Sequence, residues 1–253
     1  MNNKRENILL EAKVEDAINR VKKCNIRQFL NFLDPSQQEI CKRVLDNEKD
    51  IQSIFFGGHE HCERKKLAIH PLNDYINTWE WPISVLHLYP NYNKKELKHS
   101  DILGRLLSLG IKRNRIGDIN IIKKTIQIFI SEELQNYITY NLDTISNTSI
   151  NVEKVDWNKV ISYTSPFISN YITVSSLRLD GIVSKQYGLS RKESVLMIKS
   201  GKVKVNWQFI YNPSVILKEK DVISVRGKGR AVIKEILGKT RKGNTKILIH
   251  KNK

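Results

Sequence analysis

The chain has few of the residues that build covalent cross-links or membrane-spanning structure. Its three cysteines, Cys24, Cys41 and Cys62, are odd in number and far apart in the sequence. Such a set does not form a disulfide framework, and reduced thiols are the expectation for a cytosolic protein. No run approaches the ~20 apolar residues of a membrane-spanning helix. The opening residues, MNNKRENILL, lack the apolar segment of a secretory signal. These absences predict a cytoplasmic protein that does not associate with a membrane.

Acidic residues are also scarce, and their shortage is concentrated near one end of the chain. The sequence carries 43 Lys or Arg against 26 Asp or Glu, a net charge of +17. Residues 174–253 hold 19 basic against 5 acidic residues, a net of +14, whereas residues 1–173 hold 24 against 21, a net of +3. Lysine enrichment from a biased genome would be spread evenly. The asymmetry therefore indicates a surface that binds a polyanion, because each neutralised phosphate releases condensed counterions.

The first 78 residues are predicted to form a mainly helical domain. Residues 5–50 carry apolar side chains at roughly helical spacings, and Asp34-Pro35-Ser36 interrupts the run. A second helix is expected to start there, because proline is favoured in the first turn. Residues 54–56 form a short predicted strand.

Residues 79–165 alternate in element type and are predicted to form a second domain. Strands are expected over 83–89, 119–123, 126–130 and 150–155, and helices over 100–109 and 132–140. This β-α-β-β-α-β order is typical of a ferredoxin-like fold. Residues 158–173, which include Pro166 and several Ser and Thr residues, are predicted to be a connection.

Residues 174–253 are predicted to form a third domain that begins with two short helices. The first has an apolar stripe made of Leu179, Ile182, Val183 and Tyr187. The second is expected to begin at a capping box formed by Ser190 and Glu193 and to end near Gly201.

Basic strands are predicted to follow these helices. Residues 202–207 alternate, which puts the basic and polar side chains Lys202, Lys204 and Asn206 on one face and Val203, Val205 and Trp207 on the other. Residues 221–230 are read as a second strand with Arg226, Lys228 and Arg230 on one face. A hairpin near Lys242-Gly243-Asn244 leads to a last strand over 246–249.

The C-terminal segment resembles a known RNA-binding module. The residues SSLRLDGIVSKQYGLSRKESVLMIKSGKVKVNW, followed by DVISVRGKGR, are similar to the S-four RNA-binding domain, also called the alpha-L motif. The resemblance implies that the RNA-facing positions are Arg178, Ser190, Arg191, Lys192, Lys202, Lys204 and Asn206, with Arg226, Lys228 and Arg230 on a later basic strand. Helix N-terminal N–H groups beside Arg191 and Lys192 would favour a phosphate on physical grounds as well.

Motifs upstream extend the resemblance to nearly the whole chain. The segments DPSQQEIC (34–41), FFGGHEHCERKKLAIHP (55–71), HSDILGRLLSLGIKRNRIGDI (99–119) and QIFISEELQNYI (127–138) resemble the bacterial YlmH family. This resemblance implies a non-enzymatic factor that binds ribosomal RNA and tRNA on the large ribosomal subunit. It also implies a role in ribosome-associated quality control, with peptidyl-tRNA and a factor that tails the stalled chain as partners. The central domain would be a second RNA-binding domain of modest charge. We expect a monomer without a cofactor.

Two other function classes remain open in the sequence. Arg178-Leu179-Asp180 resembles a signature of pseudouridine synthases, in which the Asp attacks the base, but no separate catalytic domain is left in this length. An RNA-modifying enzyme with a catalytic Asp in the first two domains is one alternative. A division-linked adaptor that binds protein is the other.

Several smaller patterns favour structural roles. His59, His61, Cys62 and His70 do not have the spacing of a zinc site. Gly238-Lys239-Thr240 lacks the first glycine of a phosphate-binding loop. Gly57-Gly58 and Gly104, Gly110 and Gly117 are expected to serve turns and close packing. Glu63-Arg64 and Asp101 could form an ion pair or a protein-contact surface, and the sequence does not choose between them.

Overall fold

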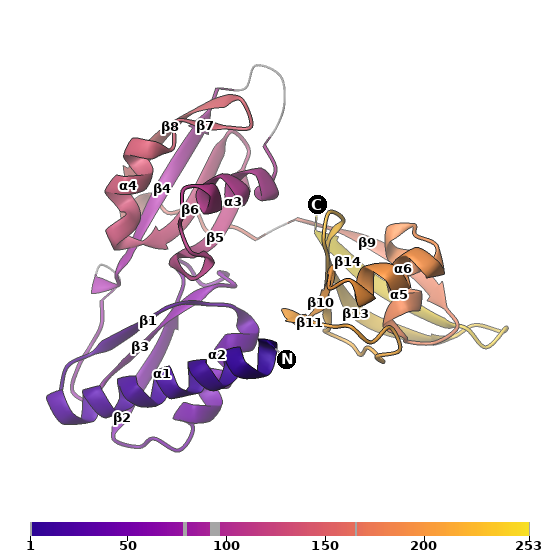
Figure 1. Cartoon of the computed structure of the whole chain (residues 1–253), viewed down its shortest axis with the longest axis horizontal. Coiled ribbons are helices and arrows are strands. Elements are labelled where there is room, and N and C mark those ends of the chain that lie inside the picture. The colour runs from indigo at the N-terminus through magenta and orange to yellow at the C-terminus, as the bar shows by residue number, and fades with distance from the viewer. Residues whose placement is uncertain (1, 78–79, 92–96, 165, 253) are drawn as a thin grey trace. The chain divides into compact units, whose positions relative to one another are not determined.

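The computed structural model describes residues 2–77, 80–91, 97–164 and 166–252. The chain divides into two compact units, Met1–Thr164 and Ser165–Lys253 (Figure 1). The predicted domain limits at residues 78–79 and 165 lie outside the described residues, so these boundaries stay predictions. In the part of the chain that is described, no helix is both long enough and apolar enough to cross a membrane.

The N-terminal part of the first unit is a three-stranded antiparallel sheet covered by two helices. Its elements are α1 (Asn2–Cys24), β1 (Gln28–Leu33), α2 (Pro35–Leu45), β2 (Ile51–Phe56) and β3 (Lys65–Pro71). The strand order is β1-β3-β2, and α1 and α2 pack on one face around residues such as Val14, Cys41 and Leu67. The predicted second helix is confirmed, with Asp34 as its N-cap and Pro35 in its first turn.

The prediction of helix from residue 5 to the interruption at Asp34 was wrong beyond Cys24. Helix α1 ends at Cys24, and Asn25 adopts a left-handed conformation with φ 55° that helical residues cannot share. Residues 28–33 then form β1, which pairs with β3 nearly forty residues away. Apolar spacing alone did not distinguish this strand, because its partner is remote in the sequence. Strand β3 itself was not predicted.

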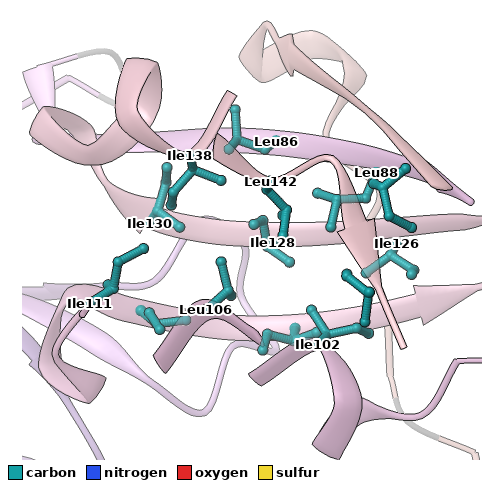
Figure 2. Packing of buried hydrophobic residues seen from close by; sticks show 14 of the residues in the cluster. Leu86, Leu88, Ile102, Leu106, Ile111, Ile126, Ile128, Ile130, Ile138 and Leu142 are labelled. Atoms are coloured by element: carbon teal, nitrogen blue, oxygen red, sulfur yellow. The ribbon is translucent and has the colours of Figure 1, made fainter. Parts of the chain in front are cut away.

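The second half of the first unit has the predicted ferredoxin-like fold. Its elements are β4 (Ile83–Pro90), α3 (His99–Ser108), β5 (Ile116–Ile122), β6 (Thr125–Ser131), α4 (Gln135–Asn141), β7 (Thr144–Ile145) and β8 (Thr148–Val155). The sheet order β5-β6-β4-β8-β7 places the first and third strands of the β-α-β-β-α-β unit at the centre, and β7 adds a short edge hairpin. Figure 2 shows the core between this sheet and its helices, in which Leu86, Ile102, Leu106 and Ile128 are fully buried.

The opposite face of this sheet is covered by the chain itself. Phe129 is fully buried there together with Phe32 and Ala68 from the N-terminal sheet. Trp81 contacts Phe29 and Phe56 with ring centroids 5.4 and 5.2 Å apart. Gly58 has φ 121° and approaches so closely that a Cβ there would lie 2.0 Å from the Phe129 ring. The double glycine therefore serves close packing, as predicted.

Polar contacts also hold together the two halves of the first unit, at a junction between the N-terminal sheet and the central sheet. The Asp118 carboxylate accepts hydrogen bonds from the backbone N–H groups of Glu63 and Arg64, at 2.7 and 3.0 Å. The Arg64 guanidinium donates to the carbonyls of Phe32 and Ile116, both at 3.0 Å. Asp101 lies elsewhere and accepts from the backbone N–H of Lys98 at the start of α3. The motifs at 55–71 and 99–119 thus meet through Arg64 and Asp118.

The second unit is a six-stranded antiparallel sheet with two helices on one face. Its elements are β9 (Phe167–Val174), α5 (Leu179–Tyr187), α6 (Arg191–Lys199), β10 (Val203–Val205), β11 (Gln208–Phe209), β12 (Val222–Val225), β13 (Gly229–Lys239) and β14 (Thr245–Asn252). The strand order is β11-β10-β12-β13-β14-β9. Leu179, Ile182 and Val183 of α5 are fully buried against the inner face of the sheet, which confirms the predicted apolar stripe.

Three details of this unit differ from the sequence prediction. The expected connection over 158–173 contains β9, whose partner β14 is the last strand of the chain and was not foreseeable from local pattern. The strand read over 202–207 ends at Val205, because Asn206 and Trp207 have φ 48° and 65° and form a tight turn. Arg226 and Lys228 lie in the turn between β12 and β13, with glycines at 227 and 229 at positive φ, and do not share a strand face with Arg230.

Candidate nucleic-acid interface

The N-terminus of α6 has the predicted capping box and leaves backbone donors free. The Ser190 hydroxyl accepts from the Glu193 N–H at 3.1 Å, and the Glu193 carboxylate accepts from the Ser190 N–H at 2.7 Å. The Ser194 N–H is the first to bond within the helix, to the Ser190 carbonyl. The N–H groups of Arg191 and Lys192 therefore lack intrahelical acceptors, and they lie at the positive end of the helix dipole. This geometry favours an anion.

Asp180 orients two arginines beside that helix end. Its carboxylate is 3% exposed and accepts from Arg178 through Nε at 3.1 Å and Nη2 at 2.9 Å, and from Arg191 Nε at 3.3 Å. The hydrogen bonds from Arg178 lower the pKa of Asp180, and Arg191 and the Gly181 N–H lower it further. The arginine side chains remain 34% and 58% exposed. Asp180 is thus a buried carboxylate that fixes the positions of two partly exposed arginines.

The turn between β12 and β13 reaches the same region. The Tyr187 hydroxyl, at the end of α5, has two carbonyl acceptors within reach of its single proton, Gly229 at 3.3 Å and Ile223 at 3.4 Å. The hydrogen bonds with Ser190 lower the pKa of Glu193, and the positive charge of Lys228 contributes to the same shift. Lys228 thus acts electrostatically on the start of α6 from the β12–β13 turn, although it is distant in the sequence. We call Arg178, Arg191, Lys192 and Lys228 the α6 cluster.

The remaining predicted cations are placed on or beside the sheet. Lys204 of β10 pairs in register with Ser224 of β12, which pairs with Arg230 of β13, so the three share the outer face. At the end of these strands the Arg226 N–H donates to the Lys202 carbonyl at 2.9 Å. The structure thus divides the predicted basic set between a helix edge and a sheet face.

Two predicted RNA-facing side chains make bonds within the module. Ser190 caps α6, as described. The Asn206 amide donates to Asp221 at 2.8 Å, and its oxygen accepts from the Val222 N–H at 2.9 Å, so it holds the β10–β11 turn against β12. These contacts give Ser190 and Asn206 structural roles, and their contact with RNA stays a prediction.

The sequence reading missed aromatic residues on the outer face of the sheet. Phe167 and Tyr171 of β9 and Phe209 of β11 are 56%, 64% and 41% exposed. Lys204 lies 4.3 Å from the centroid of the Phe209 ring, and Lys246 lies 5.0 Å from that of Tyr171. The alternation of residues 167–173 could have suggested a strand, but not its place beside β14.

Neither catalytic nor metal chemistry gains support from these side chains. The carboxylate of Asp180 is buried and bonded to two arginines, so it is not placed to attack a base. Asp118 in the first unit is bonded to two backbone N–H groups, and burial raises its pKa. Burial also raises the pKa of the Cys62 thiol to about 12, which disfavours the thiolate that binds zinc. Among the described residues no group of three or more His, Cys, Asp or Glu is arranged to hold a metal ion.

Comparisons with known proteins identify two RNA-binding families in this chain. A family model described as "Putative RNA-binding domain in YlmH" matches residues 78–159, and the S4 domain, the S-four module above, matches residues 177–223. The chain is 32% identical over 231 residues to a Bacillus subtilis protein named ribosome-associated protein quality control protein P2, covering 89% of this chain and 88% of that protein. This chain belongs to the YlmH family.

A solved relative supports the fold alone. The structure titled cell division protein YlmH from Streptococcus pneumoniae has a TM-score of 0.53 and 20% identity, and it covers 62% of this chain and 95% of that chain. Membership of the YlmH family, with two matched RNA-binding domains, assigns this protein an RNA-binding role. The S4 match ends at residue 223, before β13 and β14, and begins after β9.

Proposed function

We propose that this protein is a cytoplasmic, non-enzymatic factor that binds ribosomal RNA and tRNA on the large ribosomal subunit during quality control of stalled translation. The single observation that carries the proposal is the α6 cluster. There, Arg178 and Arg191 share the Asp180 carboxylate, Lys192 lies in the first turn of α6, where N–H groups are free, and the charge of Lys228 acts on Glu193. The name of the Bacillus subtilis relative supports a role in ribosome-associated quality control.

The charges around α6 suit a phosphate backbone. The two carboxylates nearest to the cluster, Asp180 and Glu193, are both engaged, the first with arginines and the second with the Ser190 N–H. The exposed cations therefore keep a net positive field. Arginine can bind a phosphate through two parallel hydrogen bonds, whereas lysine acts as a point charge. Structured RNA presents closely spaced phosphates that such a mixed set can contact.

We assign the first unit a positioning role. The face of the central sheet that a ferredoxin-like RNA-binding domain commonly offers to bases holds Phe129, Val85 and Gln127 here. Phe129 and Val85 are buried in the junction, and Gln127 exchanges two hydrogen bonds with the backbone of Ile161. RNA contact by this unit would use its other surfaces, and its net charge of +3 makes a small electrostatic contribution.

Co-sedimentation with purified large subunits tests the proposal. The full-length protein is expected to travel with large subunits in low salt, and the double variant Lys192→Ala with Lys228→Ala to remain mainly at the top of the gradient. A matched control, Lys13→Ala with Lys23→Ala, removes the same charge from exposed positions on α1 and is expected to travel with the subunits. Protein that never enters the large-subunit fraction would contradict the proposal and favour a protein-binding adaptor.

Mass spectrometry of RNA separates the proposal from an enzyme. Ribosomal and transfer RNA from cells with and without the protein should carry the same modifications. A modification that disappears with the protein, and returns with the wild-type chain, would contradict the non-enzymatic role.

A further inference from the structure

The outer face of the C-terminal sheet carries a second set of exposed side chains that the α6 cluster does not use. Consecutive register pairs place Phe209, Lys204, Ser224 and Arg230 in one row across β11, β10, β12 and β13. The inner positions of the same strands, including Val203, Val205, Ile223 and Val225, are buried in the core. The row therefore faces away from α5 and α6.

Strands β14 and β9 extend this face with the same mixture of side chains. Tyr171 pairs in register with Leu248, and the neighbouring pair is Thr173 with Lys246. Phe167 stacks on His250 with ring centroids 3.9 Å apart and an angle of 11° between the planes. One side of the Phe167 ring is thus covered, yet the residue remains 56% exposed. Its second face is open to a further ring.

Cations accompany the aromatic rings across the face. Lys204 lies over Phe209 and Lys246 over Tyr171, and the Arg230 guanidinium lies 5.5 Å from the centroid of the Trp207 ring. The register places one carboxylate, Glu235, opposite Leu248 on this face. Exposed aromatic rings interleaved with cations are the surface chemistry that binds single-stranded nucleic acid, because bases stack on the rings while the cations meet the phosphates.

We infer that this outer face is a stacking surface for unpaired RNA nucleotides, formed by Phe167, Tyr171 and Phe209 with Lys204, Lys246 and Arg230. It rests on the proposed RNA-binding function but uses a different surface of the module, and three of its strands, β9, β13 and β14, lie outside the S4 match. An acidic protein segment would also meet the cations. It would leave the exposed ring faces unused, so RNA is the better fit. The α6 cluster would hold structured RNA and the stacking surface an adjoining unpaired stretch.

Binding of short unstructured RNA by the full-length protein tests the inference. The probe is a fluorescently labelled oligouridine or oligoadenine, measured by anisotropy. Tyr171→Ala and Phe209→Ala should each weaken binding by about tenfold, the range expected for one lost base stack. Tyr171→Phe and Phe209→Tyr keep a ring and should bind as the wild type does. Tyr140→Ala removes an aromatic residue that is 85% exposed in the first unit and should have no effect.

The salt dependence distinguishes stacking from charge. The two alanine variants should keep the wild-type slope of log affinity against log salt, whereas Lys204→Ala with Lys246→Ala should reduce it. Ultraviolet cross-linking of the same probe should give adducts on peptides that contain Phe167, Tyr171 or Phe209. Unchanged affinity in the alanine variants, or adducts confined to other peptides, would overturn the inference.

Failure of this inference is distinguishable from failure of the proposed function. The aromatic variants could bind oligonucleotides normally while the double variant Lys192→Ala with Lys228→Ala no longer binds large subunits. In that case the stacking inference is overturned and the proposed function stands. If the aromatic variants lose large subunits but not oligonucleotides, the face binds a ribosomal protein and the inference is again overturned. Thermal unfolding of each variant should match the wild type, because the substituted rings are exposed.

Discussion

The two units of this protein use their aromatic residues in opposite ways. In the first unit Phe32, Phe129 and Trp81 fill the space between two sheets and are almost fully buried. In the second unit Phe167 and Tyr171 lie on an open sheet face beside cations. The net charge is +3 in the first unit and +14 in the second. These values equal those of residues 1–173 and 174–253, since residues 165–173 carry no charge. We propose that the buried rings suit the first unit to a positioning role, whereas the exposed rings and cations of the second unit suit it to binding RNA.

The largest expected effect is on the buried ring. Phe129→Ala should lower the free energy of unfolding by about 3–5 kcal/mol, because it leaves a cavity between the two sheets of the first unit. Tyr171→Ala, on the open face, should change it by less than ~0.5 kcal/mol. Urea unfolding followed by tryptophan fluorescence reports the difference, since Trp81 and Trp157 lie in the cluster around Phe129. An equal loss of unfolding free energy in Phe129→Ala and Tyr171→Ala would contradict the contrast between buried rings in the first unit and exposed rings in the second.

The next effect concerns a buried lysine at the same junction. Lys66 is 3% exposed, and burial lowers its pKa from the usual 10.5 to about 8, with the charge of Arg115 adding to the shift. The unfolded chain therefore holds more protons in that range, so stability should rise as the pH increases from about 8 to about 10.5. The gain should be on the order of 3 kcal/mol.

Lys66→Met should abolish that gain, because no charge then remains to be desolvated. Lys192→Met is the matched control on the exposed α6 cluster and should keep the wild-type dependence. Urea unfolding across the alkaline range measures all three proteins. A parallel pH dependence in wild type and Lys66→Met would contradict the burial of this charge.

A smaller effect is expected at the cap of α6. Ser190→Ala removes the acceptor for the Glu193 N–H and should cost about 1 kcal/mol of stability. Ser190→Asp keeps an acceptor and should retain most of that stability, although its charge adds an anion to the cluster. If RNA binding requires the orientation of α6 rather than the hydroxyl itself, Ser190→Asn, which keeps a capping acceptor without a hydroxyl or a charge, should bind RNA as the wild type does. A large loss of binding in Ser190→Asn at unchanged stability would instead indicate a direct contact by the hydroxyl.

Local patterns in the sequence predicted the parts of the fold that local interactions determine. The capping box at Ser190 and Glu193, the apolar stripe of α5 and the β-α-β-β-α-β order all depend on residues close in the chain. Strands β1 and β9 escaped prediction because each is stabilised by a partner that is remote in sequence. Strand β3 was missed although one of its two partners, β2, is the preceding strand in the chain. The turn at Asn206-Trp207 was misread as strand because alternation does not report a left-handed backbone.

The candidate site was likewise predictable only where it depends on residues close in the sequence. Charge and motif located the cations near α6, but the approach of Lys228 to Glu193 depends on how β12 and β13 pack against α5. The engagement of Ser190 and Asn206 in internal hydrogen bonds likewise required side-chain geometry. The aromatic face was missed because Phe167 and Phe209 are about forty residues apart and reach one sheet face only through four intervening strands.

The salt dependence of binding to purified large subunits tests the central claim most directly. The double variant Arg191→Ala with Lys192→Ala should bind more weakly than the wild type. Its slope of log affinity against log salt should fall by roughly one for each phosphate contact that is lost. The charge-matched variant Lys13→Ala with Lys23→Ala should keep the wild-type slope. An unchanged slope in the α6 variant would contradict the account, because it would mean that no phosphate meets this helix.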